Sequence, residues 1–229
     1  MVVLATDRTL ENELRQLPLP GVALHHSRIF NEAHVDGDTL TAMEARLPEA
    51  ASLLPAEFGF SAIGFACTSA STLIGDDGVA AAIGKSHPGV SVTNPVRAAV
   101  EAFRALGTAK VAVVTPYSEA VTMPVIERFE SDGLAVPSFG SFLIEDDLTV
   151  SRVSAESVAA GATKVLAQSP ADAVFISCTS IRLFDHVERL ESQLGVPVVS
   201  SNTAFAWHLL RSGGIDDRFE GLGELLGTH

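Results

Sequence analysis

The segment DAVFISCTSIR (172–182) contains the pattern that decides the fold, an apolar run that ends in a cysteine and continues into small polar residues. A second segment, SAIGFACTSAS (61–71), repeats this arrangement, so that Cys67 and Cys178 each open a Cys-Thr-Ser triplet. Such short apolar runs are typical of parallel strands covered on both faces. A residue at the end of a parallel strand lies at the carboxyl edge of the sheet, where open α/β folds bind their ligands.

The spacing around the two triplets predicts an internal repeat. A strand pattern ending in threonine precedes each triplet at a similar distance, 61 residues for Cys67 and 63 residues for Cys178. We therefore predict an α/β fold of two similar parallel-sheet halves, related by a pseudo-twofold axis, with the active site between them. The first half would contain residues 1–94 and 201–229, and the second residues 95–200.

The rest of the chain alternates apolar runs with helix-like segments, which favours a doubly wound architecture. Gly107, Gly133 and Gly213 stand where helices are expected to end. The expected strands are 1–6, 61–67, 110–116, 172–178 and 196–201, with weaker ones at 21–29 and 134–143, and the expected helices are 9–17, 38–54, 94–107, 118–133, 154–168 and 204–214.

Composition excludes several classes of protein. The 229 residues are 47% hydrophobic and carry a net charge of −13, so the chain can bury a sizeable core and would repel the phosphates of nucleic acids. The first residues lack the basic region of a signal peptide, and no apolar run reaches the roughly 18 residues of a membrane span. Two cysteines do not make a disulfide framework, and the seven histidines show no ligand spacing. We expect a cytoplasmic protein that binds no metal.

Two cysteines at matching strand ends can carry out chemistry without a cofactor. The residues that follow them, Thr68, Ser69, Thr179 and Ser180, are expected to cap the next helices and to help bind substrate. The N-terminus of each helix would then lower the pKa of the thiol and attract a carboxylate. Facing thiols could move protons on opposite faces of a carbon, or one thiolate could add to an electron-poor double bond. The alternative is that each cysteine is a small buried hydrophobe.

The two triplets and the segments around them resemble the aspartate/glutamate racemase superfamily. True aspartate and glutamate racemases have Cys-Asn-Thr and Cys-Thr-His instead, so this chain is more similar to the branch of maleate cis–trans isomerases and arylmalonate decarboxylases. Within that branch it resembles the racemase-like proteins of ectoine-utilisation operons. The matching segments include TDRTLENEL (6–14), FACTSASTLIG (65–75), VAVVTPYSEAV (111–121), FLIEDDLTVSRV (142–153), FISCTSIR (175–182) and PVVSSNTAFAWH (197–208).

This resemblance implies a cofactor-independent isomerase that acts on a small carboxylate and forms a dimer or a larger homo-oligomer. By the same resemblance, Cys67 would add to the substrate double bond, and Cys178 would donate or accept the proton. Tyr117 in TPY would help to hold a substrate carboxylate. Which thiol is the nucleophile rests on the family alone.

The chain departs from the maleate isomerases at two asparagines that hold carboxylates there. Asp7 replaces the first, and the acidic run 145–147, with Asp147, matches the second. Carboxylates repel a plain dicarboxylate and suit a substrate with an amino or amidino cation, such as an ectoine-derived compound. The alternative for 145–147 is a solvated turn. Asn202 is expected at the edge of the pocket, where it either binds substrate or caps the last long helix.

Three other functions stay open at this point. The chain could be an amino-acid racemase of the aspartate/glutamate type, since two facing thiols also suit inversion of a stereocentre. It could be a decarboxylase of the arylmalonate type, although members of that branch tend to use a single thiol. It could also be a non-catalytic protein that binds a metabolite in the same pocket. The sequence does not fix the substrate.

Overall fold

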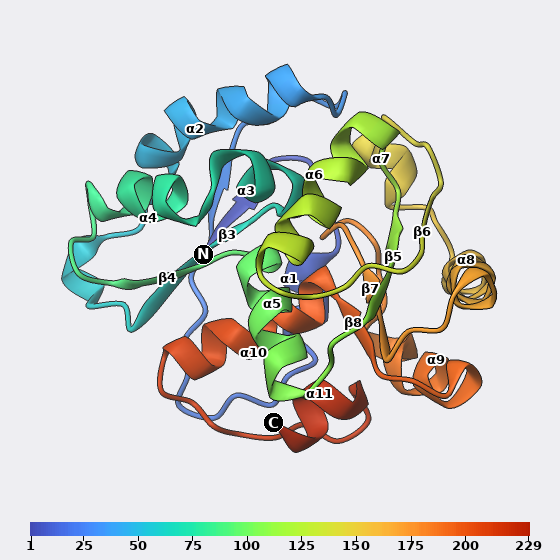
Figure 1. The fold of residues 1–229 in the computed structure, drawn as a ribbon. Coiled ribbons are helices and arrows are strands. Elements are labelled where there is room, and N and C mark those ends of the chain that lie inside the picture. Colours follow the sequence, from blue (N-terminus) through green and yellow to red (C-terminus); the bar gives the residue numbers. More distant parts are fainter.

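The computed structural model describes residues 1–229 and contains two four-stranded sheets (Figure 1). Their strand orders are β2-β1-β3-β4 and β6-β5-β7-β8, and all pairings between the named strands are parallel. The second order repeats the first, which confirms the predicted pair of similar α/β halves. The strands are β1 (Val2–Leu4), β2 (Ser27–Ile29), β3 (Ala62–Ala66), β4 (Ser91–Thr93), β5 (Val111–Thr115), β6 (Phe139–Ser141), β7 (Ala173–Ile176) and β8 (Val198–Ser200).

Helices cover the faces of both sheets. All six helices predicted with bounds are present, and the helix expected after Cys67 is α3, whereas α4, α7, α9, α11 and strand β4 were not predicted. Asn94 begins α5 as expected, because its side chain accepts hydrogen bonds from the Val96 and Arg97 N–H groups and Pro95 follows it. The helices are α1 (Leu10–Leu14), α2 (Gly37–Ser52), α3 (Thr68–Ile74), α4 (Asp76–Gly84), α5 (Pro95–Ala105), α6 (Glu119–Ser131), α7 (Asp147–Val150), α8 (Ala155–Gln168), α9 (Val187–Leu194), α10 (Ser201–Ser212) and α11 (Gly223–Thr228), with 3₁₀ turns η1 (Ala56–Phe58) and η2 (Phe184–His186).

The two sheets accommodate the central helices differently. In Figure 1, α5 and α10 lie between the two sheets. Gly64 in β3 leaves room for the ring of Phe205 in α10, which a Cβ at residue 64 would overlap. At the matching position of β7, Phe175 fills the space with its own ring, 5.0 Å from Phe129 and 6.2 Å from Phe103 between ring centroids. The predicted boundaries between the two halves stay a prediction.

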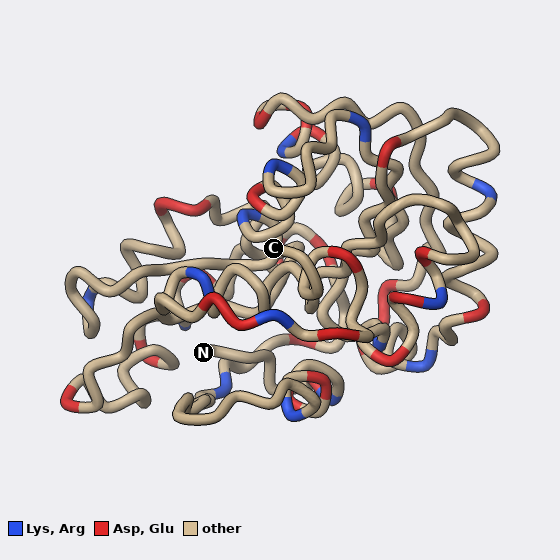
Figure 2. Tube along the Cα trace, turned by 90° about the horizontal axis from the view of Figure 1, so that it is seen from below, with Lys and Arg blue, Asp and Glu red and all other residues tan.

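The surface of the molecule is acidic. The chain has 28 Asp and Glu residues against 15 Lys and Arg residues, and Figure 2 shows them spread along the whole trace. None of the helices is both long enough and apolar enough to cross a membrane.

Candidate active site

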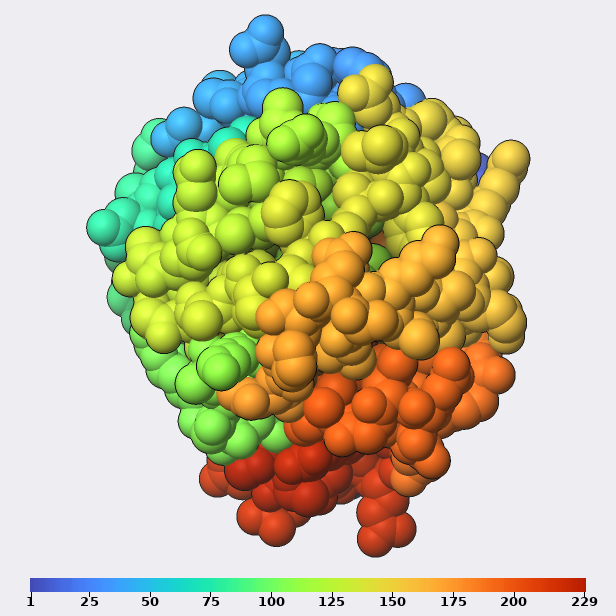
Figure 3. Space-filling model, turned by 45° about the vertical axis from the view of Figure 1, so that its right-hand side comes forward, coloured from blue at the N-terminus to red at the C-terminus, as the bar shows by residue number.

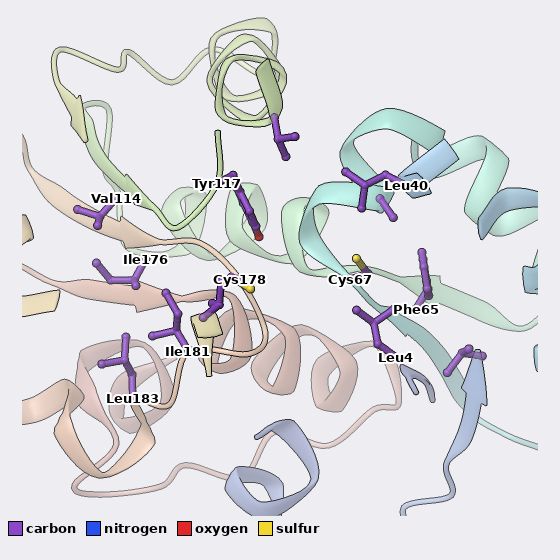
Figure 4. Close-up of a cluster of buried hydrophobic side chains, with 14 of the residues drawn as sticks. Leu4, Leu40, Phe65, Cys67, Val114, Tyr117, Ile176, Cys178, Ile181 and Leu183 are labelled. Atoms are coloured by element: carbon purple, nitrogen blue, oxygen red, sulfur yellow. The ribbon is translucent and has the colours of Figure 1, made fainter. Parts of the chain in front are cut away.

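Cys67 and Cys178 line one cavity between the two halves. Cys67 directly follows β3 and Cys178 lies just beyond β7, so both occupy the carboxyl edges of their sheets. The cavity is small and partly open to solvent. In Figure 4 the two sulfur atoms lie on facing sides of a gap, and the hydroxyl of Tyr117 points toward it. The predicted meeting of the two thiols is therefore present in the structure.

Cys67 occupies the start of a helix. It is the N-cap residue of α3, has extended backbone with φ −145°, and its Sγ lies 3.7 Å from Ser69 Oγ. Burial raises the pKa of the Cys67 thiol to about 11, although the Ala70 N–H and Ser69 act in the opposite direction. The helix start acts in the predicted direction, but loss of hydration outweighs it, so the predicted lowering of the thiol pKa is wrong. Thr68 and Ser69 do not cap α3 through their side chains.

Cys178 is followed by a turn instead of a helix. Its φ of 98° lies in the left-handed region, and the next regular elements are η2 and α9. The expected helix-capping role of Thr179 and Ser180 is therefore wrong. The Ser180 N–H donates to Cys178 Sγ over 3.4 Å. Burial and the nearby Asp147 carboxylate raise the pKa of the Cys178 thiol, again opposite to the prediction.

Asp147 brings a buried carboxylate to the cavity. Its oxygens accept hydrogen bonds from Thr6 Oγ1 at 2.5 Å, which joins the two halves, and from Ser180 Oγ at 2.8 Å within the second half. Glu145 and Asp146 are exposed, and Asp146 caps α7, so the solvated-turn interpretation fits these two residues and not Asp147. Of the predicted site residues, those that line the cavity are Cys67, Thr68, Ser69, Tyr117, Asp147, Cys178 and Thr179.

Asp7, Ser180 and Asn202 are buried and do not line the cavity. Asp7 Oδ1 accepts from the N–H groups of Thr9 and Leu10 at the start of α1, while its Oδ2 has no partner. Burial, opposed by these two bonds, raises the pKa of Asp7 to about 6.

Asn202 supports the residues around Cys178. It does not cap α10, because Ser200 does so through Thr203. Its Nδ2 donates to the Thr179 carbonyl over 2.9 Å and to Glu13 Oε2 over 2.6 Å. The capping interpretation of Asn202 is therefore wrong.

Glu13 is the buried residue that sequence reasoning missed. Its Oε1 accepts from the N–H groups of Leu183 and Phe184 at 2.6 and 2.9 Å, and burial raises its pKa to about 7 against these bonds. The signal was present in the helical period, since Leu10, Glu13 and Leu14 share the buried face of α1. A carboxylate on an apolar face requires buried partners.

Acidic side chains line the cavity, and His34 is the one basic side chain among its lining residues. Asp147, Glu32 and His34 are its titratable lining residues besides the thiols and Tyr117, and neither Lys nor Arg lines it. No group of three or more His, Cys, Asp or Glu side chains is placed to hold a metal ion. Loops from both halves meet beside the cavity, where the Val35 N–H donates to the Glu145 carbonyl and the Asp147 N–H to the Ala33 carbonyl. Figure 3 shows the segment around 140–150 against the region of α2.

Several known proteins are similar to this chain, in sequence or in structure, over nearly its whole length. A maleate isomerase from Nocardia farcinica (strain IFM 10152) is 30% identical over 238 residues, which cover 99% of this chain and 94% of that protein. A solved structure of the Nocardia farcinica maleate cis-trans isomerase, a mutant with a covalently bound succinylcysteine intermediate, superposes with a TM-score of 0.89 at 27% identity and covers 100% of this chain and 97% of that one. An arylmalonate decarboxylase from Bordetella bronchiseptica is 28% identical over 127 residues, 55% of this chain and 53% of that protein.

These relatives support an enzyme of the isomerase class, within a family that also contains a decarboxylase. The model of the arylmalonate decarboxylase family matches residues 30–226. This match covers most of the two sheets and both cysteine triplets. The chain belongs to the arylmalonate decarboxylase family.

Proposed function

We propose that this chain is a cofactor-independent isomerase of a small carboxylate, with Cys67 and Cys178 as the reacting pair. The observation that carries the proposal is the placement of both thiols in one cavity, on facing sides of one gap (Figure 4). The succinylcysteine in the Nocardia farcinica relative supports covalent chemistry at a cysteine in this fold. Thr68, Ser69, Tyr117 and Thr179 line the same cavity and would contact the substrate.

The chemistry of cis–trans isomerisation fits two thiols. The Cys67 thiolate adds to one alkene carbon, and the Cys178 thiol gives its proton to the other, which leaves a single bond that can rotate. After rotation, Cys178 takes a proton back from that carbon while the carbon–sulfur bond breaks, and the double bond re-forms in the trans arrangement. The proton and the thiolate are both returned, so no cofactor is consumed.

The charge of the cavity narrows the substrate class. Asp147 is buried and receives hydrogen bonds from hydroxyls alone, while neither Lys nor Arg lines the cavity. A substrate with an amino or amidino cation beside Asp147 would offset this charge, and a small ectoine breakdown product is one acid of this kind. The same cation would ease loss of the thiol proton, because Asp147 opposes it at both cysteines.

Amino-acid racemisation is the second candidate, and the same Asp147 favours it. An amino acid carries an ammonium group that the carboxylate can pair with, and the facing thiols lie on opposite sides of the gap. One thiolate would remove the α-proton and the other thiol would deliver a proton to the opposite face. This reaction forms no covalent adduct, which separates it from isomerisation.

The experiment compares acids in D2O with the parent protein and with Cys67→Ser and Cys178→Ser. Maleate, α-amino acids and small alkenoic acids with an amino or amidino group are the probes, followed by proton NMR and intact-protein mass spectrometry. Isomerisation gives the trans product and an adduct on Cys67, racemisation gives α-deuteration without an adduct, and decarboxylation releases carbon dioxide. Thermal stabilisation by an acid with none of these events would replace the enzyme proposal with metabolite binding.

The substrate class has its own test in Asp147→Asn, which removes the charge and keeps one acceptor oxygen, while the hydroxyl that faces the new NH2 group can accept from it. We expect the variant to gain at least about tenfold in turnover of maleate relative to a cationic acid, since a repulsion of about 1.4 kcal/mol is worth that factor. Glu145→Gln, at an exposed position of the same loop, is the matched control. Equal preference in Asp147→Asn and the parent would rule out the cationic substrate. The dimer and the cytoplasmic location remain proposals.

A further inference from the structure

Ser201 connects the two cysteine triplets through a single oxygen atom. It is the first residue of α10 and is fully buried. Its Oγ accepts hydrogen bonds from the Cys178 N–H at 3.0 Å and from Thr68 Oγ1 at 2.8 Å. A serine oxygen has two acceptor sites, so these two bonds use both of them.

Cys178, which donates one of these bonds to Ser201, has a strained backbone. Its φ of 98° is rarely adopted by residues other than glycine, and such a conformation persists only where the surroundings hold it. Cys67 has extended backbone, φ −145°, and does not need such a restraint. The Ser201 hydroxyl thus acts on the one cysteine whose orientation the chain would not otherwise keep.

The start of α10 fixes where the Ser201 hydroxyl lies. Ser200 and Thr203 form a reciprocal capping box, with the Thr203 N–H donating to Ser200 Oγ and the Ser200 N–H to Thr203 Oγ1. Because the first turn is anchored, Ser201 can hold Cys178 without moving toward it.

We propose that Ser201 is a positioning residue whose hydroxyl holds Cys178 in its orientation toward the cavity and couples it to Thr68 of the first triplet. The proposal rests on the proposed function in one respect, that Cys178 is a reacting thiol. It adds that a residue outside the cavity lining governs the geometry of that thiol.

The test measures alkylation of Cys178 by iodoacetamide between pH 6 and pH 10, with peptide mass spectrometry, in the Cys67→Ala background. In Ser201→Ala we expect Cys178 to react at least about tenfold faster, because loss of a buried hydrogen bond of this kind releases the restrained turn. The matched control is Ser27→Ala in β2, a buried serine whose Oγ has no hydrogen-bond partner, and we expect a change below about twofold. Ser201→Thr keeps the hydroxyl and restores slow alkylation. Unchanged alkylation in Ser201→Ala, or equal acceleration in Ser27→Ala, overturns the proposal.

A second variant covers the case in which Ser201→Ala does not fold. Thr68→Val removes the other bond to Ser201 and keeps the side-chain shape, so the proposal expects Cys178 to react about threefold faster, although Thr68 adjoins the other cysteine. No change there overturns the coupling.

Turnover is measured separately, with Cys67 present. We expect Ser201→Ala to lower kcat about tenfold with little change in KM, since the geometry of the reacting thiol changes and the cavity lining does not. Faster alkylation in a protein whose parent converts no acid would uphold the role of Ser201 and remove the proposed function. If the parent converts an acid and Cys178 in Ser201→Ala is alkylated no faster than in the parent, the proposed function is upheld and the role of Ser201 is overturned.

Discussion

The two cysteine corners share a sequence triplet and differ in backbone structure. At the first corner, residues 66–70, the strand passes directly into α3 with ordinary extended backbone at Cys67. At the second corner, residues 177–184, Cys178 has positive φ and an irregular turn separates it from α9. Repeating a triplet has therefore reproduced the position of the sulfur and not the path of the chain around it.

The second corner depends on segments outside its own half. Thr9 Oγ1 donates to the Ser180 carbonyl over 3.0 Å, and Glu13 accepts from the N–H groups at its far end. Asn202 and Ser201 at the start of α10 add bonds to Thr179 and Cys178. The first corner makes one such bond to the other half, at the Ala66 carbonyl, which accepts from Thr179 Oγ1 at 3.5 Å, and its bond from Thr68 to Ser201 stays within the first half. A strained corner thus requires external support that a helix start does not.

The largest effect should follow from the cysteines themselves, and it separates their roles. We expect Cys67→Ser and Cys178→Ser each to lower turnover by more than about 10³-fold, because residues that act as a pair lose most of their activity when either is removed. Only Cys178→Ser should accumulate a covalent adduct, on Cys67, by peptide mass spectrometry with the acid that the parent converts. An adduct on Cys178 in Cys67→Ser would reverse the two roles.

Glu13→Ala should cause the largest loss of stability. The substitution leaves three buried N–H donors without an acceptor, those of Leu183, Phe184 and Asn202, at about 1 kcal/mol or more each. We expect urea unfolding to show a loss of at least about 3 kcal/mol. Glu11→Ala on the same helix is the control, because Glu11 pairs with the partly exposed Arg28 and should cost below about 1 kcal/mol. Similar losses in both variants would mean that the second corner does not depend on Glu13.

The dependence of stability on pH should single out the same residue. Burial raises the Glu13 pKa from 4.5 to about 7, so the folded protein binds more protons than the unfolded chain in that range, and stability falls as pH rises through it. Met1 acts in the opposite direction, since burial lowers the pKa of its amino group to about 5. We therefore compare the parent with Glu13→Gln, which does not titrate. Relative to the variant, the parent should lose roughly 2–3 kcal/mol of unfolding free energy between pH 5 and pH 8. A constant difference across this range would show that Glu13 titrates normally.

These effects follow from contacts that the sequence could only partly predict. The parallel strands, the repeat and the position of both cysteines at a sheet edge were predictable, because apolar runs and strand ends are local features. The paths after Cys67 and Cys178 were not, since the triplets are identical and the difference comes from residues 9–13 and 201–202. The direction of the thiol pKa shifts depends on burial, which the sequence does not show.

The shortest elements were missed, or expected without bounds, for a related reason. β4 has three residues, and the first four residues of α3 are all buried, which removes the amphipathic period that identifies a helix. Asp147 was predicted to lie at the pocket and lines the cavity. Glu13 was missed, although the helical period places it on the buried face of α1. Buried polar residues on apolar faces are the signal to look for in such a chain.

A steric test asks whether the first sheet needs Gly64 to leave room for the ring of Phe205 in α10. Gly64→Ala introduces a Cβ that overlaps the ring of Phe205, and overpacking of this kind should cost about 1–3 kcal/mol in urea unfolding. Gly84→Ala is the control, because a Cβ at the end of α4 meets no atom within 4 Å and should stabilise the helix slightly. Adding Phe205→Leu to Gly64→Ala should recover part of the loss. If Gly64→Ala is as stable as the parent, β3 does not require the missing side chain.

The smallest effect should come from the ion pair that joins the halves near the surface. Arg128 in α6 donates through Nη2 to Asp76 in α4 at 2.7 Å, and its Nε donates to Asp132 at 2.5 Å. The side chains of Arg128 and Asp76 are 21% and 24% exposed, so solvent and salt screen their attraction. We expect a double-mutant cycle of Arg128→Met and Asp76→Asn to give about 1 kcal/mol of coupling, reduced at 1 M salt. A coupling larger than the loss in Glu13→Ala would mean that surface charge, and not the buried bonds around Cys178, holds the two halves together.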